Sequence, residues 1–223
     1  MQIFGSIIEK DKKFIFHFKK NQEDFVVSDS IHTFSENKIF VYIDGVVTKL
    51  SDDANKISRR FKTINKKIAY LYYSGFDLES HIIGSFNIYL FNYALSQLKI
   101  IRDTRGTRSI FYAQNEKDFI FSSSQDLLIE RLPSVSLNEN KLIDFLNWDY
   151  RSNDETYFNE ISRIRPKNYL ILEKMNIVTK KYKTSMELFN RYKNKDSKEN
   201  FKKLLYQSVE SVSNRNQKIG LMM

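Results

Sequence analysis

The segment from His81 to Ser124 constrains the fold more than any other part of the chain. Gly84–Asn92 and Leu95–Ile101 alternate bulky and polar residues, which is the period-two pattern of paired β-strands. After a turn rich in arginine, Ser109–Ala113 and Asp118–Phe121 alternate again around a short polar run. The sequence therefore predicts a β-meander followed by a second hairpin.

The turn between these elements contains Arg102, Asp103, Arg105, Gly106 and Arg108. Gly106 can supply a positive φ, and Asp103 can either cap backbone amides or pair with a neighbouring arginine. We interpret the cluster as a structural corner rather than as a chemical site built from arginine and aspartate.

The remaining patterns predict strands in the first fifty residues, helices on either side of the meander, and a late pair of strands. Stacked antiparallel sheets with helices outside satisfy this order, so the predicted fold class is α+β, a four-layer αββα sandwich. The expected strands are Ile3–Ile8, Phe14–Phe18, Phe25–Val27, Ile39–Ile43, Tyr169–Leu172 and Ile177–Tyr182. A turn is expected at Asp44–Gly45. The expected helices are Asp52–Ser74, which ends at Gly75, and Gln125–Arg131.

The C-terminal part of the chain predicts a separate unit. A polar stretch, residues 186–196, has the composition of a linker between a domain at 1–185 and a second segment at 197–223. Within that segment, Lys198–Ser213 carries one apolar helical face and Lys218–Met223 has the pattern of a buried strand.

Composition excludes several kinds of site. The chain of 223 residues has no cysteine, and its three histidines, His17, His32 and His81, show no metal-ligand spacing, so we expect no metal site and no thiol chemistry. We expect the histidines to be strand or packing residues.

No apolar run reaches the length of about 18 residues that spans a bilayer, and the N-terminus lacks the pattern of a signal peptide, which together predict a cytoplasmic protein without membrane contact.

The net charge of +9 raises the question of nucleic-acid binding. Basic pairs interleaved with aromatics such as Tyr70, Tyr72 and Tyr73 could contact phosphates and bases. The basic pairs, however, are spread along the whole chain, from Lys12–Lys13 to Lys202–Lys203. We interpret them as a solvated surface and expect no nucleic-acid partner.

These elements resemble the N-terminal domain of the asparagine synthetase family, a class II glutamine amidotransferase domain of the Ntn-hydrolase type. That family has a G-x-F strand, an R-D-x-x-G corner with two aromatics after it, and an F-x-S strand end before a leucine-rich helix. Here the residues that match these motifs are Gly84, Phe86, Arg102, Asp103, Gly106, Phe111, Tyr112, Phe121, Ser123, Leu127 and Leu128. The resemblance continues downstream through Leu137–Leu146, Glu155–Phe158, Ile161, Ile164 and Pro166. Lys167 stands where the family has a glycine.

The resemblance also identifies the segment 197–223 as the first helix and strand of an ATP-pyrophosphatase synthetase domain. It implies that Leu221, Met222 and Met223 would approach adenine through backbone groups, just before the family's phosphate-binding loop. ATP and Mg²⁺ would be needed only with the whole synthetase domain, so we expect this chain alone to bind neither.

The resemblance implies a glutaminase site that has lost its chemistry. The family's nucleophile is a cysteine directly after the initiator methionine, activated by its own α-amine, and here that position is Gln2. The family's N-G-E motif is reduced to Asp44, Gly45 and Val46, its pocket aspartate aligns with Thr63, and its carboxylate-binding arginine has no counterpart. Glutamine hydrolysis is therefore not expected, and Gly84, Phe86, Arg102, Asp103, Gly106, Tyr112 and Ser123 are expected to be a structural signature.

Two hypotheses of different kinds follow. The first is the inactive amidotransferase-like domain of an ATP-dependent amide-forming ligase, resembling β-lactam synthetases and lasso-peptide cyclases, with a peptide or an amino-acid derivative as substrate and a synthetase domain or polypeptide as partner. The second is a non-enzymatic partner-binding module that docks through the helix Lys198–Ser213. A glutamine-hydrolysing asparagine synthetase is a further alternative, and it would require glutamate release from glutamine.

Overall fold

The computed structural model describes residues 3–10, 13–20, 23–26, 38–115, 118–148, 156–182 and 197–213. The chain divides into two compact units, Met1–Tyr182 and Lys183–Met223. The expected linker at 186–196 and strand at Lys218–Met223 lie outside the described residues, whereas the expected helix near Lys198–Ser213 is confirmed as α6, Ser197–Ser213.

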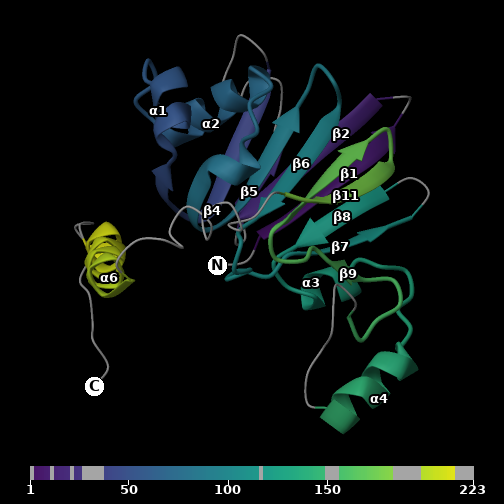
Figure 1. Ribbon diagram of the computed structural model, residues 1–223. Helices are drawn as coiled ribbons and strands as arrows, with labels where there is room; N and C mark the ends of the chain where they lie inside the picture. Colours follow the sequence, from purple (N-terminus) through teal and green to yellow (C-terminus); the bar gives the residue numbers. More distant parts are fainter. Residues whose placement is uncertain are drawn as a thin grey trace. The chain divides into compact units, whose positions relative to one another are not determined.

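The first unit contains two antiparallel sheets (Figure 1). The six-stranded sheet has the order β3-β2-β1-β8-β7-β9, and the five-stranded sheet has the order β11-β10-β6-β5-β4. The strands of the first sheet are β1 Ile3–Lys10, β2 Lys13–Lys20, β3 Glu23–Val26, β7 Phe111–Gln114, β8 Asp118–Ser122 and β9 Ser162–Arg163; those of the second are β4 Ile39–Leu50, β5 Ile82–Asn92, β6 Gln97–Arg102, β10 Asn168–Glu173 and β11 Asn176–Lys181.

Helices lie on the outer faces of both sheets. α1 (Asp52–Ile57) and α2 (Ile64–Tyr73) cover the five-stranded sheet, where α2 contacts β4, and the short α3 (Asp126–Ile129) contacts β8 of the other sheet (Figure 1). A 3-10 turn, η2 (Glu79–His81), leads into β5, and α4 (Glu139–Trp148) follows α3. The predicted α+β fold of two antiparallel sheets with helices outside is confirmed.

Alternation along β5 explains how the layers hold together. Tyr89 and Phe91 point into the core between the sheets, whereas Ile88 and Leu90 point outward into the core beneath α1 and α2. All four side chains are at most 1% exposed. A strand covered on both faces needs apolar residues at nearly every position, and this is why β5 is so apolar.

Two local expectations were wrong. Asp44–Gly45 is not a turn, because β4 continues through it to Leu50 with an irregularity between Val47 and Lys49. The single helix expected at Asp52–Ser74 is two helices. The hydroxyl of Ser58 donates to the Ala54 carbonyl at 2.6 Å, a local side-chain bond that competes with continuation of α1.

The expected end of the helix at Gly75 is confirmed. Gly75 has φ +71°, its N–H donates to the Tyr72 carbonyl, and the Phe76 N–H donates to the Leu71 carbonyl. These two bonds form a Schellman motif, which ends α2 with its last carbonyls satisfied.

Candidate functional site

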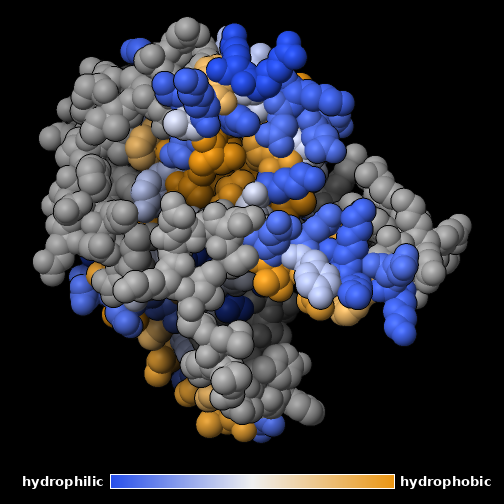
Figure 2. Space-filling view, turned by 90° about the vertical axis from the view of Figure 1, so that its left-hand side faces the viewer, coloured by the Kyte–Doolittle hydropathy of each residue, from blue (hydrophilic) through white to orange (hydrophobic). Residues whose placement is uncertain are grey.

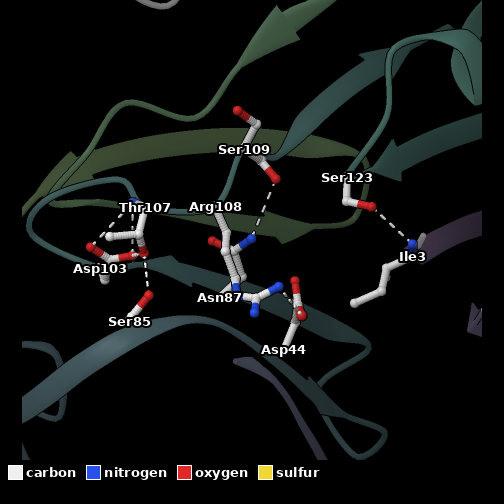
Figure 3. Close-up of polar contacts among 9 residues, drawn as sticks. All are labelled: Ile3, Asp44, Ser85, Asn87, Asp103, Thr107, Arg108, Ser109 and Ser123. Carbon is white, nitrogen blue, oxygen red and sulfur yellow. Dashed lines mark hydrogen bonds and ion pairs between the residues drawn. The ribbon is translucent and has the colours of Figure 1, made fainter. Parts of the chain in front are cut away.

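The candidate site lies where the start of β1, the middle of β4, β5 and the loop after β6 come together (Figure 3). Ile3 is anchored there by two serines. Its N–H donates to Ser123 Oγ at 2.9 Å, and its carbonyl accepts from Ser122 Oγ at 2.8 Å. Gln2, which is expected from the resemblance at the nucleophile position, immediately precedes this anchored residue in sequence and lies outside the described residues.

Asp44 and Arg108 form an ion pair at this place, with Arg108 Nη1 3.0 Å from Asp44 Oδ1 (Figure 3). The two partners differ in exposure, since the Asp44 side chain is 2% exposed and the Arg108 side chain is 42% exposed. The carboxylate is therefore buried, and the guanidinium lies between it and solvent.

Gly45 makes room for this arrangement. Its φ of +110° is unfavourable for other residues, and a Cβ there would lie 2.2 Å from the Ser85 carbonyl oxygen and 2.8 Å from Arg108 Nε. Any larger residue would push against the backbone of β5 and against the arginine. The glycine of the Asp44–Gly45–Val46 segment thus permits close strand pairing and the approach of Arg108.

Buried polar groups surround the ion pair. Asn87 is fully buried on β5, and its amide nitrogen lies 3.4 Å from the Ser109 carbonyl, at the long end of hydrogen bonding. Burial, with the charge of Asp44 as the second cause, raises the pKa of Tyr89 well above its usual value of 10.0. The same two causes raise the pKa of Tyr42, so both phenols are protonated at neutral pH. We call Asp44, Gly45, Asn87, Tyr89 and Arg108 the Asp44 site.

The adjacent loop, residues 102–107, forms a corner held by Asp103. Its carboxylate accepts from the N–H groups of Arg105 and Gly106, each at 2.8 Å, and from the N–H and hydroxyl of Thr107 at 3.1 and 2.6 Å. The Thr107 hydroxyl also lies 2.6 Å from Ser85 Oγ, which connects the loop to β5. Of the two roles that the sequence allows for Asp103, the structure therefore shows backbone capping.

Arg102 supports the same loop from its other side. Its guanidinium donates to the carbonyls of Arg108 and Gly106, each at 2.8 Å, and to that of Ile164. Its own carbonyl accepts from Tyr182 Oη at 2.6 Å. Burial, and secondly the charge of Arg163, lowers the pKa of Arg102 below its usual range. We call residues 102–107 the Arg102–Asp103 corner.

The other residues singled out in the sequence take different places. Thr63 is the exposed residue before α2 and makes no capping bond with its side chain, while Val46 is half-buried on β4. Gly84 pairs with Val47, and a Cβ there would lie 2.2 Å from the Val46 carbonyl oxygen, so this glycine also permits close strand pairing. Phe86 is buried on β5, Tyr112 lies on β7, and Leu221, Met222 and Met223 lie outside the described residues.

Three features of the Asp44 site were not predicted from the sequence: Asn87, Tyr89 and the pairing of Arg108 with Asp44. One signal was available, since Asn87 is a polar residue inside the apolar run of β5 and such residues are usually hydrogen-bonded or functional. The pairing of Arg108 with Asp44 spans 64 positions, and no local pattern reports it.

Within the described residues, no group of three or more histidine, aspartate or glutamate side chains could hold a metal ion. None of the helices in this part of the chain is long and apolar enough to cross a membrane.

Comparison with known families gives one match. The model of the glutamine amidotransferase domain family matches residues 49–183, which contain the Arg102–Asp103 corner and β5 to β11 but neither Gln2 nor Asp44. No curated protein resembles the chain closely enough in sequence to count as a match.

Among solved structures, two similar ones are the glutamine phosphoribosylpyrophosphate amidotransferase from B. subtilis and an allosteric regulatory enzyme of purine biosynthesis. They share 9% and 11% identity with TM-scores of 0.42 and 0.44, and each alignment covers 82% of this chain. A glutamine aminotransferase class-II domain protein from Silicibacter pomeroyi shares 9% identity over 82% of this chain and 98% of its own length, with a TM-score of 0.43. The chain spans 43% of the length of the first two.

Proposed function

The chain belongs to the glutamine amidotransferase domain family, and we propose that it is a member without glutaminase activity, serving as the amidotransferase-like domain of an ATP-dependent amide-forming ligase of the asparagine synthetase type. The observation that carries the proposal is Gln2 at the position of the nucleophile. A carboxamide is not a nucleophile toward the side-chain amide of glutamine, because its nitrogen lone pair is delocalised into its own carbonyl group.

The Asp44 site supports the same conclusion. Hydrolysis of an amide requires donors aimed at the oxygen that becomes negative in the transition state. In the family resemblance, Asp44 replaces the asparagine of the N-G-E motif, and a carboxylate at that place repels an oxyanion. Arg108 already pairs with this carboxylate and lies against Gly45, so the cation compensates the buried charge of the protein itself.

Without ammonia from glutamine, the ligase would join a carboxylate to an amine supplied by its substrate. ATP would activate the carboxylate as an adenylate, and Mg²⁺ would bind with ATP in the synthetase domain or in a separate synthetase polypeptide. We propose a peptide or an amino-acid derivative as the substrate and the cytoplasm as the location. The present chain would contribute its scaffold and, through Leu221, Met222 and Met223, the backbone that leads to the nucleotide.

A non-enzymatic module is the second candidate, and one observation favours it. α6 exposes an apolar face, with Phe201 66%, Leu205 53% and Val209 61% exposed. Such a face on an amphipathic helix is typical of a docking element for a partner protein. A glutamine-hydrolysing asparagine synthetase is disfavoured by Gln2 and by Asp44.

The experiment that tests the proposal measures glutamate release from glutamine by the purified chain. We expect the rate to equal the rate without enzyme. We also expect background rates for Gln2→Cys alone, because Asp44 and Arg108 still occupy the oxyanion side. Glutamate release by the natural chain at an enzymatic rate would overturn the proposal.

The ligase part has a separate test. The chain is combined with an asparagine synthetase-like synthetase polypeptide, and pyrophosphate exchange into ATP is measured with candidate peptide carboxylates. Exchange that depends on both polypeptides is expected. Stable association without any exchange would favour the partner-binding module instead.

A further inference from the structure

Positive charge gathers between the end of α1 and the start of α2 on the first unit, whereas the first turn of α1 carries the acidic Asp52 and Asp53. Half of the twelve residues from Lys56 to Lys67 are basic, and none of the twelve is acidic. These six cations compare with a net charge of +9 for the whole chain. We call them the basic surface: Lys56, Arg59, Arg60, Lys62, Lys66 and Lys67.

Solvent reaches most of these cations. All are exposed except Lys67, which is half-buried and donates to Asn55 Oδ1 at 3.1 Å. Within the described residues, the basic surface makes no ion pair, because the four ion pairs there use Lys49, Lys99, Arg108 and Lys141. In Figure 2 hydrophilic residues, in blue, gather toward the upper right, beside an orange hydrophobic patch, at the height where α1 and α2 lie in Figure 1.

The fold holds this charge on a rigid support. Ala54 of α1 and Ile68, Ala69 and Leu71 of α2 are fully buried in the core under the helices, so the cations are confined to the opposite face. Like charges at this spacing repel one another, and packing alone does not require them. An anionic partner would convert that repulsion into attraction.

Arg60 indicates which kind of anion fits. Its guanidinium carbon lies 4.7 Å from the centre of the Phe61 ring and 4.2 Å from that of Tyr70. Stacking fixes the direction of the guanidinium edge, which is the group that binds carboxylates in a bidentate way. The same stacking occupies one face of each ring, which reduces the aromatic surface open to the bases of a single-stranded nucleic acid.

Exposed apolar groups lie in the same helices. Ile57 is 44% exposed and Tyr73 is 56% exposed. Apolar contacts of this kind suit a polypeptide that mixes acidic and apolar side chains better than they suit a phosphate backbone. We propose that the basic surface is a docking site for an acidic segment of a partner protein.

The test is the binding of a fluorescein-labelled glutamate-rich peptide, measured by anisotropy at physiological salt. The variant Arg59→Gln/Lys62→Gln/Lys66→Gln removes three exposed charges but keeps the stacked Arg60, and we expect it to weaken binding about tenfold. Arg60→Lys keeps the charge but loses the planar guanidinium, and we expect about threefold weaker binding.

The matched control is Lys174→Gln/Lys180→Gln/Lys181→Gln, which removes the same charge from the hairpin of β10 and β11. β11 and β4 are the two edges of the five-stranded sheet, and α2 contacts β4. The control should bind like the natural chain, and the glutamine-substituted form of the peptide should not bind. Equal losses in both triple variants, absence of peptide binding, or tighter binding of a labelled poly-uridine RNA would each overturn the proposal. None of these outcomes affects the glutaminase test.

Discussion

The Arg102–Asp103 corner and the Asp44 site are neighbours, but they use their charged groups differently. In the corner, Arg102 and Asp103 are 3% and 1% exposed and do not pair with each other; each binds backbone groups of the same loop or of the segment just before β10. In the Asp44 site, Asp44 on β4 pairs with a half-exposed arginine from the loop after β6. In the corner the two buried charges bind backbone groups and one hydroxyl of the loop, whereas the Asp44 site has a side-chain ion pair that reaches solvent.

The difference distinguishes charged residues that hold the fold from charged residues that form a side-chain pair near solvent. A carboxylate that accepts four hydrogen bonds from its own loop has no remaining capacity for a substrate, so residues such as Asp103 are retained for the fold alone. The Asp44 site contains Asp44 and Gly45, two of the residues that the resemblance implies for a glutamine pocket, and its buried carboxylate is paired with a side chain instead of with its own loop. The proposed loss of glutaminase activity would therefore leave the contacts of the corner unchanged.

Replacing Asp103 by alanine should destabilise the chain more than any change in the Asp44 site. It leaves three backbone N–H groups and the Thr107 hydroxyl without their acceptor, and we expect a loss of about 3 to 4 kcal/mol in the free energy of unfolding. Urea denaturation followed by circular dichroism measures it. Asp103→Asn keeps part of the accepting capacity and should lose about half as much; equal stability of Asp103→Ala and the natural chain would show that the corner does not hold the fold.

Gly45→Ala tests whether close packing in the Asp44 site also stabilises the fold. Its Cβ would meet the Ser85 carbonyl oxygen at 2.2 Å in a backbone with φ +110°, and we expect a loss of about 3 kcal/mol. Gly75→Ala is the matched control, because Gly75 also has a positive φ but a Cβ added there would meet no atom within 4 Å. The control should lose only about 1 kcal/mol. Similar losses for both variants would mean that strand packing at Gly45 contributes nothing.

Much of the scaffold could be predicted from sequence because its signals are local. Alternation predicts β5 and β6, and the Gly75 stop follows from the conformational freedom of glycine at the end of α2. The structural corner at Asp103 was likewise predicted, although the sequence left open whether Asp103 caps backbone amides or pairs with an arginine.

The Asp44 site could be predicted only in part because its contacts are distant in sequence. Asp44–Gly45 has the local pattern of a turn, and it is a strand only because β5 pairs with it along its length. The pairing of Arg108 with Asp44 depends on how two strands and a loop meet in space. Tertiary contact therefore overrides the local signal at the site, while it agrees with the local signal in the corner.

Removing the cation of the Asp44 site should have a smaller effect than the glycine substitution. In Arg108→Gln the buried Asp44 carboxylate loses its partner, but water can partly replace a side chain that is 42% exposed, so we expect a loss of about 1 to 2 kcal/mol. In Asp44→Asn/Arg108→Gln the loss should be smaller than the sum of the two single variants, as measured by a double-mutant cycle in urea. Additive losses would mean that the ion pair does not couple the two residues.

The smallest effect at neutral pH is expected for Tyr89, beside the ion pair, which changes stability only in alkaline solution. Burial raises the pKa of Tyr89 well above 10.0, so from about pH 10 upward the phenol ionises in the unfolded chain but stays protonated in the folded one. The contribution of Tyr89 to stability is complete below pH 10 and is lost as the pH rises, by up to about 1.4 kcal/mol per pH unit. Tyr89→Phe should flatten this alkaline decline in urea titrations, whereas Tyr73→Phe, at a phenol that is 56% exposed, should leave it unchanged. An identical decline in all three proteins would show that the interior beside Asp44 admits enough water to ionise Tyr89, and the Asp44 site would then be open where the corner is closed.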